Sequence, residues 1–449
     1  MSKLRVVDKA APSIPEHITP PSGRIVKTYC IEVITPIYGG WAKTGKYDEN
    51  NIIRAFSVRG NLRFWWRATR GAQFISRKKL FENESEIWGS VEKPSKVMVK
   101  VNCPYRDKKR KYKNEDKDKY GFSRNGEEHY VLFSALAETN KHDLVQEGST
   151  NDRFIFEVTL SYDIVCEKDV ECAIWAWVNF GGIGSRTRRG CGALYCEELA
   201  PEKTESINAW LKHNIDKDKY NLNLINVRNW STLSNRIFIG IAQTDSFNAG
   251  KTGSTQTGSI KAWKKSIAPM KDFRQGERFG RDERSDNLKP AGRSRWPEPD
   301  TLRKLIPGEE EYSHLPRDFV PNGFPRAAFG LPISFKFING DGPNGADEKG
   351  LKIKPEGLER MASPIILRPL KTGNGVLPMI VQLNSKLPSS IEISETEHKY
   401  SCQEIINAKF SKPEYTNSPM KGRTTSGDAV TAFLNFACEE HYSFKEVSI

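Results

Sequence analysis

The sequence lacks long hydrophobic runs and closely spaced metal ligands. No apolar stretch approaches the roughly 18 residues that a membrane-spanning helix needs. The 8 cysteines are thinly spread over 449 residues without a Cys-x-x-Cys pair, and the 7 histidines lack a His-x-x-x-His spacing. Residues 1–24 carry charges and prolines where a signal peptide needs an apolar core. We therefore expect a cytoplasmic protein with reduced cysteines, no membrane association and no metal.

Complete motifs for nucleotide binding or catalysis are also missing. Residues 40–46 match the start of a phosphate-binding loop, but Tyr47 replaces the hydroxyl residue that reaches magnesium. Residues 245–252 have the correct end of that motif, yet Asp245 replaces its first glycine. No paired carboxylates or nucleophile elbow stand out, although a lone histidine such as His129 could serve a metal-independent ribonuclease; a solvated surface histidine is the alternative. We expect no cofactor.

Positive charge is what the sequence has in excess. Lys and Arg number 69 against 56 Asp and Glu, which gives a formal charge of +13 and a pI near 9.2. This balance favours a polyanionic partner, either nucleic acid or an anionic membrane, and the missing apolar runs set membrane insertion aside. The length predicts about two or three domains.

The segment 57–70 joins four arginines to two adjacent tryptophans. At about 100° per residue it predicts a helix with two faces. One face carries Arg59, Arg63, Arg67 and Arg70, and the other carries Val58, Leu62, Trp65, Trp66 and Thr69. Cations at i, i+4 spacing repel one another, so carboxylates, solvent or a polyanion must relieve them. We assign the tryptophans mainly to the core and the arginines to an anion; an ordinary solvated basic face is the alternative.

The first half of the chain has the pattern of a split β-α-β fold. After a flexible arm at 1–26, strands are predicted at 27–37, 96–101, 153–165 and 193–199, with helices at 57–70 and 168–180. A charged stretch at 105–128 interrupts them and is too polar to bury much. This order predicts a ferredoxin-like domain over 27–205 with an insertion near 103–150.

A glycine-rich loop precedes the last strand of this domain. Residues 181–192 hold five glycines and three arginines. Glycines such as Gly182 and Gly184 allow backbone amides to approach phosphates, and Arg186, Arg188 and Arg189 add charge-assisted contacts. A flexible turn with incidental charge is the alternative.

The second half, 206–449, is predicted to be another α+β domain. Strands are expected at 236–242, 331–337, 364–368 and 376–383, with a helix at about 428–440. Its basic segment, 245–300, contains interspersed aromatic residues, Trp263, Phe273, Phe279 and Trp296. Basic residues interleaved with aromatics suit single-stranded nucleic acid. A disordered basic linker is the competing interpretation.

Together, seven segments resemble the RAMP-superfamily subunit one of the Cmr complex, the type III-B CRISPR effector. They are 35–40, 57–67, 87–90, 181–192, 295–299, 324–332 and 360–364, in the order of that family. The resemblance implies two ferredoxin-like, RRM-related domains with charged loop insertions. It also implies a ribonucleoprotein that uses CRISPR RNA to recognise target RNA. There, subunit one caps the end that holds the guide's 3′ region, while other subunits cleave and polymerise.

We therefore expect a non-catalytic, RNA-binding capping subunit with CRISPR RNA, target RNA and other Cmr subunits as partners. The residues expected to bind RNA are Arg54, Arg59, Arg63, Arg67, Gly182, Gly184, Arg186, Arg188, Arg189 and Arg326. Replacing the three loop arginines should weaken RNA binding and leave the fold intact. Two alternatives stay open: a metal-independent endoribonuclease that matures CRISPR RNA, and a target-cleaving backbone subunit of the same effector.

Overall fold

The structure is a computed structural model that describes most of the chain between Gly23 and Ile449. The described residues are 23–40, 48, 51–103, 126–136, 144–145, 154–224, 228–243, 258–283, 292–305, 316–317, 323–335, 337, 351–388, 390–393, 399–401, 418–425 and 427–449. Most of the predicted arm, both near-matches to a phosphate-binding loop, and most of the charged stretch at 105–128 lie outside these ranges. No helix in the described ranges is long and apolar enough to cross a membrane.

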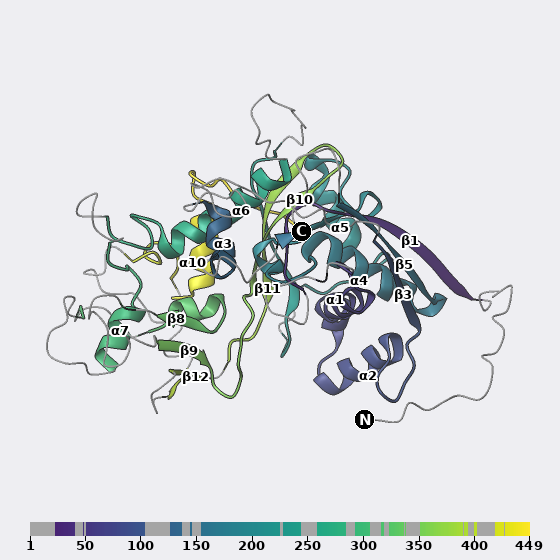
Figure 1. Ribbon diagram of the computed structural model, residues 1–449, viewed down its shortest axis with the longest axis horizontal. Helices are drawn as coiled ribbons and strands as arrows, with labels where there is room; N and C mark the ends of the chain where they lie inside the picture. Colours follow the sequence, from purple (N-terminus) through teal and green to yellow (C-terminus); the bar gives the residue numbers. More distant parts are fainter. Residues whose placement is uncertain are drawn as a thin grey trace, which may run out of the picture.

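The first half is an antiparallel sheet with two helices on one side (Figure 1). Its elements in chain order are β1 (Arg24–Val33), α1 (Ala55–Ala68), β3 (Val97–Asn102), β5 (Phe154–Asp163), α4 (Glu167–Phe180) and β6 (Leu194–Tyr195). The strands lie in the order β3-β5-β1-β6. If these four strands are numbered by their order in the chain, they lie in the sheet in the order second, third, first and fourth. Every buried residue of β5 alternates with an outward one, as expected for a sheet covered on one face.

The second half repeats this order. Its corresponding elements are β7 (Thr232–Ile239), α6 (Gly258–Gln275), β10 (Ile365–Lys371), β11 (Val376–Asn384), α10 (Ala429–Ala437) and β14 (Lys445–Glu446). The sheet order is β10-β11-β7-β14, again second, third, first and fourth, with antiparallel pairing throughout. The repeated β-α-β-β-α-β order in both halves confirms the α+β class.

The remaining elements are insertions and connections around these two units. In the first half they are β2 (Ile37–Tyr38), α2 (Arg77–Trp88), α3 (Glu127–Leu136), β4 (Leu144–Val145) and α5 (Ile207–Ile215). In the second they are α7 (Glu298–Leu305), β8 (Ile333–Phe335), β9 (Leu351–Pro355), β12 (Ser390–Ile393) and β13 (Lys399–Ser401). Short 3-10 helices occur at Arg70–Gln73, Ile164–Cys166, Thr187–Arg189, Glu197–Leu199, Thr204–Ser206 and Pro325–Phe329. β8, β9, β12 and β13 form a third sheet, at the left of Figure 1.

One hydrophobic cluster contains residues of both halves. All seven residues of β10 are buried, and β11 is buried over most of its length, because helices lie on both faces of this sheet. Leu233, Ile366 and Met379 from the second sheet join the same cluster as residues of α1 and α4. On the other face, α6 packs on β10 and β11. The predicted division near 205 therefore separates two structural units that are packed together.

A buried arginine on β10 crosses this junction. Arg368 is fully buried and donates to the carbonyl oxygens of Val178 (2.9 Å), Gly181 (2.6 Å) and Leu194 (2.8 Å), all in the first half. These groups include orphan carbonyls at the C-terminal end of α4, which a helix leaves without internal donors. Removal of water lowers the pKa of the Arg368 guanidinium to about 9. Arg368 thus hydrogen-bonds the two sheets together.

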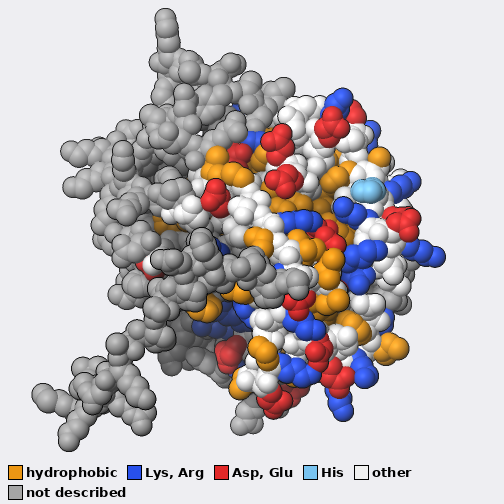
Figure 2. Space-filling view, turned by 90° about the vertical axis from the view of Figure 1, so that its right-hand side faces the viewer, with side chains coloured by type: hydrophobic (Ala, Val, Ile, Leu, Met, Phe, Trp, Pro, Cys, Tyr) orange, Lys and Arg blue, Asp and Glu red, His pale blue; other side chains and the backbone are white. Residues whose placement is uncertain are grey.

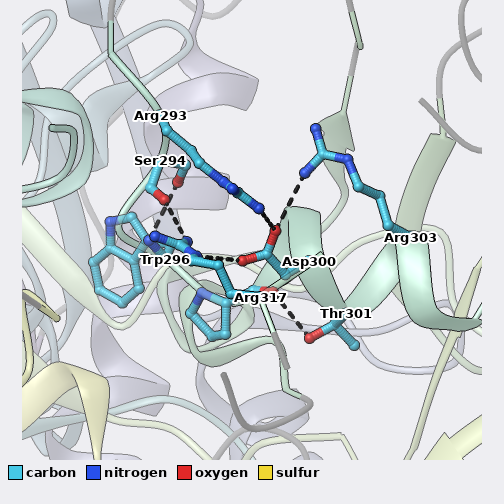
Figure 3. A network of polar contacts seen from close by, with 8 residues as sticks. Arg293, Ser294, Trp296, Asp300, Thr301, Arg303 and Arg317 are labelled. Atoms are coloured by element: carbon cyan, nitrogen blue, oxygen red, sulfur yellow. Dashed lines mark hydrogen bonds and ion pairs between the residues drawn. The ribbon is translucent and has the colours of Figure 1, made fainter. Parts of the chain in front are cut away.

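A second buried polar cluster lies around α7 (Figure 3). The Asp300 carboxylate is 1% exposed. It forms ion pairs with the guanidinium groups of Arg293 (2.7 Å), Arg317 (2.7 Å) and Arg303 (3.3 Å). Three guanidinium groups around one carboxylate leave a net positive charge in this cluster. Some of their remaining donors bind backbone oxygens, as Arg317 does with the Ser294 carbonyl. This cluster anchors the segments on either side of α7.

Two expectations about the second half are wrong. Trp263, Phe273 and Trp296, proposed as stacking residues of a basic segment, are fully buried in the core. Residues 258–275 form α6 with its aromatic face against the sheet, so they are not a disordered linker either. Within α6 the basic side chains lie outside the buried face, where Lys264 and Lys271 pair with Glu128 and Glu127 of α3.

Candidate nucleic-acid interface

α1 forms the centre of the candidate interface and has the two faces that its sequence predicts. Val58, Leu62, Trp65 and Trp66 are buried, and the helix packs on α4. The assignment of both tryptophans to the core is confirmed, because they are 3% and 1% exposed. The Trp66 indole also donates to the carboxylate of Asp169 (2.7 Å), which fixes the ring inside the fold.

A buried carboxylate relieves the repulsion between the arginines of α1. One carboxylate oxygen of Glu84 on α2 accepts hydrogen bonds from both Arg63 Nε and Arg67 Nη1, each at 2.6 Å. Arg59 donates to the backbone oxygens of Trp88 and Val97, and its desolvation lowers its pKa. Arg54, in the N-cap position, donates to the Gly40 carbonyl. Glu84 offsets only one of the two charges beside it, so the surface stays basic.

The glycine-rich loop is shaped by close packing against the chain itself. A Cβ on Gly182 would lie 2.8 Å from the Gly192 carbonyl oxygen, and one on Gly184 would lie 2.9 Å from the Tyr38 oxygen. Gly184 also has a φ of +85°, which favours glycine. The amides of Ile183 and Ser185 donate to Gly192 (2.9 Å) and Tyr38 (2.7 Å). These glycines permit a tight internal turn, and their neighbours' amides are engaged within the protein.

The arginines of this loop bind other parts of the chain. Arg188 donates to the Ser363 carbonyl, and Arg189 donates to the Ile365 carbonyl (3.3 Å), both beside β10 in the second half. Burial lowers the pKa of each to about 10. Arg186 donates to the Val131 carbonyl of α3. In contrast to the expectation from the sequence, we predict that replacing Arg188 and Arg189 also destabilises the fold, because both side chains connect the two halves.

Arg326, the last predicted RNA-binding residue, lies inside the second half. Its Nε is 3.2 Å from the Glu298 carboxylate, and its guanidinium lies over the rings of Trp296 and Phe335. Glu298 is fully buried and Arg326 nearly so. The structure thus separates Arg326 from the arginines of α1 and places it in an internal ion pair.

A groove opens beside the arginines of α1. It has a volume of about 650 Å³ and is lined by Arg59 and Arg63 of α1, Phe81 of α2 and residues of the segment Gly89–Ser95. The lining residues include three cations, Arg59, Arg63 and Lys93, and no carboxylate. Figure 2 shows the side of the molecule with β1, β3 and β5, where Lys and Arg side chains adjoin hydrophobic ones. The groove combines positive charge with apolar surface.

Neither α2 nor this groove was predicted from the sequence. The signals were present: Ser76 caps α2 by accepting a hydrogen bond from the Lys79 amide (3.3 Å), and Gly89 ends the helix with a φ of +78°. The groove depends on the distance between α2 and α1 in space, and one sequence does not provide that distance.

Gly60 of α1 gives a test of how open this helix face is. A Cβ at this position would meet nothing within 4 Å. We expect Gly60→Ala to raise the free energy of unfolding by about 0.5–1 kcal/mol, since glycine disfavours a helix interior by that amount. Urea denaturation of the full chain measures it. A loss of stability would mean that the space over Gly60 is filled.

The described residues offer no arrangement typical of a metal site, since no three His, Cys, Asp or Glu side chains there could hold an ion together. His129 lies on α3, directly after two residues that pair with α6: Glu128 binds Lys264 and Glu127 binds Lys271. These lysines hold α3 against α6, so they are engaged in packing the helix that carries His129.

The fold and this groove define an α+β protein of two repeated units with a basic, partly apolar surface on the first. Residues 30–195 match the family model of the RAMP superfamily. This match covers less than half of the chain, and the similarity to two curated proteins confirms that the chain resembles subunit one of the Cmr complex.

Two curated proteins of Pyrococcus furiosus are similar to this chain. CRISPR system Cmr subunit Cmr1-1 is 28% identical over 199 residues, which are 44% of this chain and 55% of that protein. The match thus spans about half the length of that relative. Subunit Cmr1-2 is 28% identical over 182 residues, or 38% of this chain and 94% of that protein.

Solved structures give weaker likenesses. The apo crystal structure of Cmr1 from Pyrococcus furiosus has a TM-score of 0.44 and 17% identity, over 85% of this chain and 96% of that one. A chain from the cryo-EM structure of the type III-B Cmr-beta complex bound to cognate target RNA has a TM-score of 0.42 and 10% identity, over 92% of this chain and 99% of that one.

Proposed function

We propose that this chain is an RNA-binding, non-catalytic capping subunit of a type III-B CRISPR ribonucleoprotein. The observation that carries the proposal is the groove beside α1, whose lining holds Arg59, Arg63 and Lys93 without a carboxylate. Such a surface suits a phosphate backbone. The names of the two curated relatives supply the complex, a CRISPR Cmr system. Its partners are then CRISPR RNA, target RNA and other Cmr subunits in the cytoplasm.

We also propose that each half is a ferredoxin-like, RRM-related domain. The support is the β-α-β-β-α-β order of both halves and the identical sheet order of their strands. Charged loop insertions separate these elements in both halves. Helices of the first unit pack on the sheet of the second, and the basic groove lies on the first unit.

Within this proposal, the RNA-contacting role is assigned to the arginines of α1 in preference to the glycine-rich loop. Arg54, Arg59, Arg63 and Arg67 follow one another along the helix, and the side chains of Arg63 and Arg67 are about one third exposed. Arg188 and Arg189 are desolvated and engaged with the second half. Gly182 and Gly184 support the turn, while Arg186 lies at its outer edge over the ring of Tyr38.

Binding of single-stranded RNA should be strongly sensitive to salt. If three groove cations each neutralise one phosphate, the slope of log affinity against log salt is about −2, a loss of roughly 20-fold between 50 and 200 mM. Fluorescence anisotropy of the full chain with a labelled oligoribonucleotide measures this slope. Affinity that stays constant over this range would contradict the proposal.

The double variant Arg63→Gln/Lys93→Gln should reduce both the affinity and the slope. Lys445→Gln is the matched control, because Lys445 is exposed on β14 of the second half, outside the groove. Incubation with labelled repeat RNA and with guide–target duplex tests the two enzymatic alternatives. Cleavage products that appear without metal would favour the maturing endoribonuclease, and a cut target strand would favour the backbone subunit.

A further inference from the structure

The groove beside α1 has rigid walls. Arg59 donates to the oxygens of Trp88 and Val97, which flank the segment Gly89–Ser95. Within that segment the Ser90 amide donates to the Lys93 carbonyl (2.9 Å), and the Ser90 hydroxyl accepts from the Lys93 amide (3.2 Å). These bonds hold the loop at a fixed distance from α1.

Its polar groups suit a phosphate. Arg63 uses Nε to bind Glu84, and within the described part of the chain no hydrogen bond involves its Nη atoms; the side chain is 30% exposed. Lys93 stands at the other wall, half-exposed and paired with Glu86 at the surface. Two donors on opposite sides of an open groove can contact one phosphate or two successive ones.

Its apolar groups suit a base. Phe81 is 59% exposed although it lines the groove, and Val91, another lining residue, is fully exposed. An aromatic ring left in water beside cations is the arrangement by which proteins stack single-stranded bases.

The exposed stripe of α1 continues the same surface. Phe56, Arg59, Gly60 and Arg63 follow the i, i+3, i+4, i+7 spacing of one helix face. Phe56 is 88% exposed, and the space over Gly60 is empty. An RNA strand that leaves the groove along this stripe would contact a second aromatic ring, Phe56, and the helix surface over Gly60, where no side chain protrudes.

We propose that this groove binds one nucleotide of a single-stranded RNA, with the base stacked on Phe81 and the adjoining phosphates facing Arg63 and Lys93. The inference rests on the proposed function and adds to it a base-stacking contact. The cationic lining favours RNA over an apolar protein segment, which would cover the Arg63 donors that Glu84 does not bind and would desolvate the Lys93–Glu86 pair.

The test compares a labelled oligoadenylate with an abasic oligonucleotide of the same length on the full chain. Phe81→Leu keeps apolar area and removes the aromatic face, so it should weaken oligoadenylate binding about 5- to 150-fold and leave abasic binding unchanged. Phe81→Trp should retain binding of both. Ile75→Ala is the matched control, since Ile75 is an exposed apolar residue outside the groove.

The outcomes separate this inference from the function on which it rests. Equal oligoadenylate affinity of Phe81→Leu and wild type, with a loss for Arg63→Gln/Lys93→Gln, overturns the stacking site and keeps RNA binding. If wild type binds neither oligonucleotide in a salt-dependent way, the proposed function itself fails. If Phe81→Leu binds RNA normally but no longer joins the assembled complex, the occupant is protein and the inference is wrong. An 8-azidoadenosine probe should label Gly89–Ser95; labelling elsewhere counts against the site.

Discussion

Replacement of Arg368 by alanine is expected to lower the free energy of unfolding by about 3–5 kcal/mol. The carbonyls of Val178, Gly181 and Leu194 would lose their donor in a site without water, at roughly 1–3 kcal/mol each. Part of this loss is offset, because the folded state of the variant no longer carries the cost of burying the Arg368 charge. The carbonyl loss dominates, because the backbone acceptors stay buried after the guanidinium is removed.

Urea denaturation followed by circular dichroism measures this effect. One transition is expected, since residues of both halves form one hydrophobic cluster and should unfold together. Arg360→Ala is the control: Arg360 is exposed near β10, and its loss should change stability by no more than about 0.5 kcal/mol. Equal stabilities of the two variants would show that the Arg368 bonds contribute nothing net.

Arg368 also shows where sequence reasoning reached its limit. Its acceptors lie between 174 and 190 residues earlier in the chain, so no local pattern indicates them. The same holds for Arg188 and Arg189, whose acceptors on the second half lie more than 170 residues later. Arginines beside glycines look alike in sequence whether they meet phosphates or distant carbonyls. Charge alone does not distinguish an RNA contact from an internal junction.

Periodicity was more informative than composition. The pattern in 57–70 predicted α1 and its buried tryptophans, because burial repeats every 3.6 residues. In 258–275 the same rule was available, since Trp263, Ile267, Met270 and Phe273 follow a helical spacing. Basic composition drew attention to RNA instead, and the prediction of stacking there was wrong. The six elements of the first β-α-β-β-α-β unit were predicted in the correct order, although α2 was missed and β1 begins at Arg24, before the expected start.

Trp66→Ala should cost about 3–5 kcal/mol of unfolding free energy, as truncation of a large buried ring does. The ring is 1% exposed, lies 6.1 Å from the Phe74 ring, and donates to Asp169, which also binds Arg70 (3.2 Å). The variant therefore opens a cavity and removes one donor from a shared carboxylate. Trp66→Phe keeps most of the volume and should lose only about 1–2 kcal/mol, mainly from the missing indole donor.

Phe56→Ala is the matched control, because Phe56 is an aromatic residue of the same helix that is 88% exposed. Its free energy of unfolding should stay within about 0.5 kcal/mol of wild type. The effects on RNA affinity should be reversed. Phe56→Ala should weaken RNA binding if the RNA strand follows the exposed stripe of α1, whereas Trp66→Phe, once folded, should bind RNA normally. A Trp66→Phe variant with wild-type stability and lost RNA binding would mean that the buried ring takes part in recognition. Since its indole is held by Asp169 inside the core, we expect stability alone to change.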